Sequence, residues 1–121
     1  MSHIVTIKTK VSDPVAIAAA CRRLRLAEPV QGTARLYGGE ATGWLVRLPD
    51  WNYPLVIDAA TGTIRFDNFG GLWGQQAELD RFLQAYAVEK TKLEAHKKGL
   101  AFSEHFLQDG SIRVQVRRVA V

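Results

Sequence analysis

The stretch from residue 51 to residue 74 reads WNYPLVIDAATGTIRFDNFGGLWG, and it decides how the chain folds. Two apolar runs, Tyr53–Asp58 and Thr63–Asp67, flank the turn sequence Ala-Ala-Thr-Gly, and this arrangement predicts a β-hairpin. The double glycine at 70–71 then opens a long run with apolar residues at helical spacing, which predicts a helix from about residue 75 to residue 98. Gly99 follows as a cap, because glycine tolerates the left-handed conformation that ends many helices.

The remaining elements follow from the same periodicities and turn residues. They are, in chain order, a strand over 3–11, a helix over 14–24, strands over 31–37 and 42–48 around the turn Gly38-Gly39-Glu40, and a final hairpin of 101–107 and 111–116. Asp13 and Pro14 form the start signal of the first helix. The order β-α-β-β-β-β-α-β-β indicates one α+β domain over 1–121, with a mostly antiparallel sheet and two helices packed on one face.

Composition and charge are those of an ordinary globular chain. Of its 121 residues, 47% are apolar and 23% are charged, and no apolar run is long enough to span a membrane. The formal net charge of +4 permits binding to nucleic acid or acidic surfaces without requiring it. Cys21 is the single cysteine, so no intramolecular disulfide can form, and the N-terminus lacks the pattern of a signal peptide. We therefore expect a cytoplasmic protein with no membrane association.

Aromatic, asparagine and glycine residues concentrate in two predicted loops that flank the central hairpin. This composition is typical of surfaces that recognise a partner, because rigid rings and amides supply contact area and hydrogen bonds. The residues predicted to bind a protein partner or a ligand are Trp51, Asn52, Tyr53, Asn68, Phe69 and Trp73. The alternative is that the rings belong to the core.

Three arginines occupy outward positions on predicted strands. If the strands that carry Arg47, Arg65 and Arg113 are neighbours, one open sheet face becomes an arginine-rich plane with aromatic rings at its edge. Such a plane could neutralise phosphates and stack bases, which would make it a nucleic-acid-binding surface. An ordinary solvated sheet face explains the same pattern, since antiparallel sheets commonly leave one face wet.

Histidine and cysteine residues give no strong metal-binding or catalytic signal. His96, Glu104 and His105 match no zinc spacing, and Glu104 and His105 point to opposite faces of a strand. Cys21 lies on the apolar stripe of its helix, which favours a buried structural thiol over a nucleophile. We predict no metal and no cofactor.

Aspartates at strand ends supply the remaining catalytic hypothesis. Asp50, Asp58 and Asp67 could act as acids or hold Mg²⁺, although turn chemistry alone favours aspartate at such positions. A mechanism with paired carboxylates needs two of them close together. A small enzyme with an aspartate-based, metal-dependent site is therefore the third hypothesis, after a protein-binding module and a nucleic-acid-binding domain.

Several short stretches together resemble a known family. They are Met1–Ile4 with the strand that follows, Tyr37–Gly39, Asp67–Gly71, Tyr86–Lys90, and Lys97–Gly99 leading into Asp109–Ile112. On these stretches the chain is similar to the DUF1257 family of unknown function, which includes the Ycf35-like proteins of cyanobacteria and plastids. The resemblance implies a compact soluble protein without defined catalytic residues. It also implies an adaptor role beside an AAA+ ATPase, because such proteins lie near AAA+ ATPases in genomes.

The leading hypothesis from the sequence is a non-enzymatic binding or adaptor module that acts through the aromatic loops and the outer sheet face. The partner is an unknown protein, with an AAA+ ATPase as the candidate that the resemblance implies. The alternative is a nucleic-acid-binding domain that uses the arginine face. The oligomeric state stays open, and a homodimer is compatible with the sequence.

Overall fold

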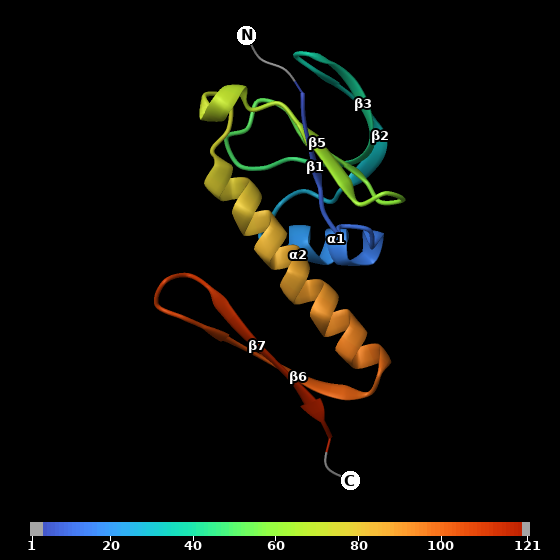
Figure 1. Ribbon diagram of the computed structural model, residues 1–121, viewed down its shortest axis with the longest axis vertical. Helices are drawn as coiled ribbons and strands as arrows, with labels where there is room; N and C mark the ends of the chain where they lie inside the picture. The colour runs from blue at the N-terminus through green and yellow to red at the C-terminus, as the bar shows by residue number, and fades with distance from the viewer. Residues whose placement is uncertain (1–3, 120–121) are drawn as a thin grey trace.

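The computed structural model describes residues 4–119, and within them two α-helices and seven strands follow one another in the predicted order (Figure 1). The elements are β1 (Val5–Lys8), α1 (Pro14–Arg23), β2 (Val30–Leu36), β3 (Gly39–Val46), β4 (Leu55–Asp58), β5 (Thr63–Phe66), the short 3-10 helix η1 (Phe69–Gly71), α2 (Gln76–Lys97), β6 (Leu100–Phe106) and β7 (Ile112–Arg118). The α+β class is confirmed. The first strand is shorter than predicted, and residue 3 of that prediction lies outside the described residues.

The turn between β2 and β3 begins one residue earlier than the glycine pattern predicts. Tyr37 and Gly38 form the loop, and Gly39 is already the first residue of β3. Tyr37 therefore lies outside the strand, and its side chain is 63% exposed.

Five strands form one antiparallel sheet in the order β1-β5-β4-β3-β2, so β1 and β2 are its edges. In the described part of the chain β6 and β7 pair only with each other and form a separate two-stranded sheet. Figure 1 shows α1 and α2 between the larger sheet and this hairpin. The helices thus cover one face of the larger sheet, and the last two strands lie beyond them.

The main core lies between the larger sheet and the two helices. Its fully buried members include Ile17, Ala20 and Cys21 from α1, Leu79 and Phe82 from α2, and Val46, Leu55, Ile57 and Ile64 from the strands. Burying a side chain such as Phe82 contributes about 1.5–3 kcal/mol to the free energy of unfolding. Burial of Cys21 in this core raises the pKa of its thiol to about 11. The thiol therefore stays protonated at neutral pH, which agrees with a structural role.

A second, smaller apolar cluster lies on the opposite face of the same sheet. Ala34, Leu36, Ala41 and Val56 are buried there, with Leu45 packed against them. The outer face is therefore only partly open to water, and its solvated part lies toward β5 and β1, where Thr6, Lys8 and Arg65 are exposed.

One buried hydroxyl joins α2 to the segment between β1 and α1. The Tyr86 Oη atom accepts hydrogen bonds from the backbone N–H groups of Ser12 and Asp13, each at 3.1 Å. It also donates to the carbonyl of Lys10 at 3.4 Å. Tyr86 is only 5% exposed, whereas Lys10 and Ser12 lie at the surface, so this hydroxyl links a buried ring to backbone groups at the edge of the core.

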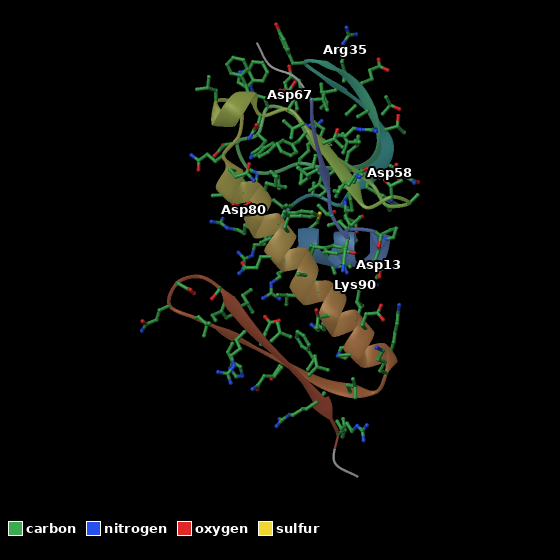
Figure 2. All side chains as sticks on the ribbon, in the orientation of Figure 1. Asp13, Arg35, Asp58, Asp67, Asp80 and Lys90 are labelled. Atoms are coloured by element: carbon green, nitrogen blue, oxygen red, sulfur yellow. The ribbon has the colours of Figure 1, made fainter. Side chains whose placement is uncertain are left out.

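The carboxylate of Asp13 strengthens the same junction. Its Oδ1 atom caps α1 by accepting from Val15 N at 2.9 Å, as the sequence predicts. Its Oδ2 atom lies 2.9 Å from the Lys90 ammonium, which also binds Glu94 at 2.8 Å. Figure 2 shows Asp13 and Lys90 side by side where α1 begins. The Lys90 ammonium lowers the pKa of Asp13, so the negative charge that caps the helix persists to more acidic pH.

An ion pair attaches the C-terminal hairpin to α1. The Arg23 guanidinium donates to both carboxylate oxygens of Glu104 on β6, at 3.1 and 2.5 Å, and to Glu89 on α2 at 3.4 Å. An isolated two-stranded sheet is marginally stable in water, so β6 and β7 need this contact and their packing on α2.

We expect replacement of Tyr86 by Phe to lower the free energy of unfolding by about 1–3 kcal/mol, because two backbone N–H groups lose their acceptor. Urea denaturation followed by far-UV circular dichroism measures the change. Tyr37→Phe is the matched control, since the Tyr37 ring is exposed and its hydroxyl is open to water. Equal stability of the two variants would show that water replaces the Tyr86 hydroxyl without cost.

Candidate binding surface

The loop from Asp67 to Gly74 is closed on itself by Asn68. The Asn68 carbonyl accepts from the backbone N–H groups of Gly71 at 3.0 Å and Trp73 at 2.9 Å. Its side-chain amide donates to the carbonyl of Gly74 at 3.2 Å and is buried. Gly70 adopts φ 60° and Gly71 φ 104°, conformations that favour glycine. The loop therefore has a defined shape, which its own hydrogen bonds maintain.

A second set of contacts attaches this loop to the turn that precedes β4. The Trp51 indole N–H donates to the carbonyl of Gln75 at 3.1 Å, and the backbone N–H of Asn52 donates to the carbonyl of Trp73 at 2.9 Å. A Cβ atom at Gly74 would come within 2.4 Å of the Trp51 ring, so only glycine allows this approach. Trp51 is 9% exposed and belongs to the core.

Trp73 is the centre of an aromatic cluster at the outside of the loop. Its ring stacks on Phe69 with centroids 4.7 Å apart, and Tyr37 and Tyr53 approach it at 5.2 and 5.8 Å with tilted planes. Leu72 precedes Trp73 in the chain and is 76% exposed. We call these five residues, Tyr37, Tyr53, Phe69, Leu72 and Trp73, the aromatic patch.

The buried carboxylate of Asp67 links two of the segments that carry the aromatic patch. Asp67 is fully buried, and its Oδ2 atom accepts from the backbone N–H of Gly38 at 3.3 Å. This bond fixes the Tyr37-Gly38 turn against the start of the loop that carries Phe69 and Trp73. Figure 2 places Asp67 at the same end of the sheet as Arg35 of β2, near η1. Residues from three distant segments thus form one surface.

The structure divides the predicted aromatic-loop residues into two groups. Trp51 and Asn68 are buried and shape the loop from inside, whereas Asn52 is exposed and Tyr53, Phe69 and Trp73 are half-buried. Tyr37 and Leu72 complete the surface and are missing from the sequence prediction. Leu72 could have been found from the sequence, because it lies beside Trp73 between glycines. Tyr37 is brought to the patch by the pairing of β2 with β3, which its own sequence neighbourhood does not reveal.

The three predicted arginines do not form one plane. Arg65 lies on β5 opposite Val56 and Thr6, and Arg47 follows the end of β3; both are exposed. Arg113 lies on β7 opposite His105, in the hairpin on the far side of the helices. The condition that all three strands be neighbours is therefore not met.

The candidates for metal binding and acid–base chemistry lie apart from one another. Glu104 is engaged by Arg23, and within residues 4–119 no three His, Cys, Asp or Glu side chains gather closely enough to hold a metal ion. Asp58 accepts from the backbone N–H of Ala60 at 3.0 Å at one end of the β4–β5 pair, and Asp67 follows the other end. Figure 2 shows this separation, so these two carboxylates do not form a pair.

Comparison with known proteins adds no relative. No protein-family model matches the chain, and none of the curated proteins or solved structures matches it. The resemblance to the DUF1257 family therefore stays a prediction. None of the described helices is both long enough and apolar enough to cross a membrane.

We expect Gly74→Ala to lower the free energy of unfolding by roughly 1–3 kcal/mol, because the new methyl group would overlap the Trp51 ring. Urea denaturation measures the loss, and the shift of Trp fluorescence reports displacement of the indole. Gly32→Ala is the matched control, since its Cβ would meet only Leu45 at an ordinary 3.8 Å. If Gly74→Ala were as stable as this control, the loop would not depend on close contact with Trp51.

Proposed function

We propose that the protein is a non-enzymatic binding module that recognises another protein through the aromatic patch. The observation that carries the proposal is the exposure of Tyr37 and Leu72, at 63% and 76%, beside rings that are packed around Trp73. Exposed apolar side chains that gather on a rigid base are typical of interfaces, where Tyr and Trp contribute most of the binding energy. Since the base is already ordered by Asn68 and Asp67, little conformational entropy is lost on binding.

A macromolecular partner fits this surface better than a small ligand. Phe69 and Trp73 stack at 4.7 Å, so the two rings fill the space between them and leave no slot for a third ring. Together with the exposed Tyr37 and Leu72, these rings supply an apolar surface. A partner with a complementary apolar depression would cover it, and the half-buried Trp73 would be at its centre.

Nucleic-acid binding is the alternative, and the position of the arginines weakens it. Arg65 and Arg113 lie on opposite sides of the helical layer, so one strand of nucleic acid could not follow both along a continuous sheet face. Nuclease treatment separates the two functions in the experiment below.

The resemblance to the Ycf35-like family would make an AAA+ ATPase the first partner to examine. Under this proposal the protein is an adaptor that presents the patch to the ATPase or to its substrate. No catalytic residue is needed for such a role.

We expect Tyr37→Ala and Leu72→Ala each to weaken partner binding about tenfold or more without loss of stability, since each side chain is exposed in the free protein. The tagged full chain and both variants are incubated with lysate of the source organism, treated with nuclease, and the captured proteins are quantified by mass spectrometry. A specific partner is one that both variants lose.

Phe106→Ala is the matched control, because Phe106 is an equally exposed aromatic residue (72%) on the distant hairpin. It should retain the partner. Identical capture by wild type, Tyr37→Ala and Leu72→Ala would exclude the patch, and loss of all captured material on nuclease treatment would favour the nucleic-acid alternative.

A further inference from the structure

Strand β1 leaves one edge of the larger sheet open. Residues of an antiparallel strand alternate between those whose backbone groups face the partner strand and those whose groups face away. The backbone N–H of Thr9 donates to Gly62 beyond the end of β5, at 2.9 Å, so Val5 and Ile7 face β5 as well. The N–H and C=O groups of Thr6 and Lys8 therefore point away from the sheet. Such an edge can pair with another extended chain.

The segment that follows this edge strand meets α2. Lys10 continues the alternation of Thr6 and Lys8, whose backbone groups point away from β5. Its carbonyl accepts a hydrogen bond from the Tyr86 hydroxyl of α2 at 3.4 Å. Between residues 8–12, which include the last residue of β1, and α2 lies a groove of about 660 Å³, and Tyr86 is part of its lining. Figure 1 shows β1 running toward the middle of α2, in agreement with this arrangement.

The groove is lined by both apolar and basic side chains. Val11, Leu83, Tyr86 and Ala87 supply apolar surface, while Lys8 at the end of β1 and Lys10 beyond it supply positive charge. Both of these lysines are exposed, and no ion pair engages either within the described residues. Lys90 lines the same groove, but Asp13 and Glu94 already bind its ammonium. The uncompensated charge along the edge is therefore positive, which selects a negatively charged occupant.

We propose that this groove binds an extended acidic segment of another protein, which adds to β1 as a sixth strand. The backbone of the segment pairs with Thr6 and Lys8. Its apolar side chains alternate toward Leu83 and Ala87, and its carboxylates lie beside Lys8 and Lys10. This mode of recognition takes affinity from main-chain hydrogen bonds and specificity from alternate side chains. The proposal does not rest on the aromatic patch, because the two surfaces share no residue.

The probe is a blocked seven-residue peptide of alternating Glu and Val, titrated into the ¹⁵N-labelled full chain. We expect amide shifts over residues 6–10 and 83–91, with no comparable shifts at Tyr37 or Trp73. The same peptide with Lys in place of Glu should bind at least about tenfold more weakly, because its charges meet those of Lys8 and Lys10. The same should hold for a peptide that is N-methylated at alternate residues, because it loses main-chain donors.

Two variants test the geometry. Thr6→Pro removes an N–H group that points outward, a position where edge strands tolerate proline, and should weaken binding about tenfold or more. Ala87→Trp fills the groove from the exposed surface of α2 and should abolish binding even if Thr6→Pro fails to fold. Ala77→Trp is its matched control, since Ala77 is an exposed alanine of α2 outside the groove.

Three outcomes would overturn the proposal. The first is the absence of shifts in the groove at millimolar peptide. The second is equal binding of the Glu and Lys peptides. The third is a dimer in sedimentation velocity that Thr6→Pro dissociates, because it would mean that a second copy of the chain occupies the edge. Loss of shifts in Ala87→Trp but not in Ala77→Trp would support the proposal whatever the aromatic patch binds.

Discussion

The Tyr86 hydroxyl is the interaction on which the arrangement of sheet and helices depends. It bonds Ser12, Asp13 and Lys10 at once, so the end of β1, the cap of α1 and the middle of α2 meet at one buried oxygen. The site is sensitive because two backbone N–H groups share this acceptor, and a buried N–H group that loses its acceptor costs about 1–3 kcal/mol. The Asp13–Lys90 ion pair lies beside it and holds the same two helices by charge.

Helix α2 connects the two proposed interaction surfaces. Its N-terminal side is fixed by Trp51, whose indole binds the Gln75 carbonyl and whose ring fills the space that Gly74 leaves open. Its middle contributes Leu83 and Ala87 to the groove along β1. The groove therefore uses side chains of α2 directly, whereas the residues of the aromatic patch all precede this helix in the chain.

The sequence patterns within each segment were enough to predict the helices and strands. They could not predict which residues from distant segments come into contact. The helix start at Asp13 and the hairpin around Asp109-Gly110 follow from short-range chemistry, and both are present. The burial of Trp51 depends on Gly74, and neither residue alone reveals that contact. Arg113 looked equivalent to Arg65 because both alternate outward, but strand alternation says nothing about which sheet a strand joins. Tyr37 was likewise missed, since its contact with Trp73 needs the curl of the β2–β3 pair.

The distribution of charge explains why an acidic partner suits this chain better than its net charge alone suggests. Asp13, Glu89 and Glu104 are used inside the fold, where they bind Lys90 and Arg23 between elements. Carboxylates engaged in this way contribute less to the outer potential, because Lys90 and Arg23 partly neutralise them. The charges left at the surface near β1 include those of Lys8, at the end of the strand, and of Lys10, which follows it in the chain, and Arg65 lies on the neighbouring strand β5. At physiological ionic strength fields are screened within about 8 Å, so a partner responds to this local pair and not to the overall +4.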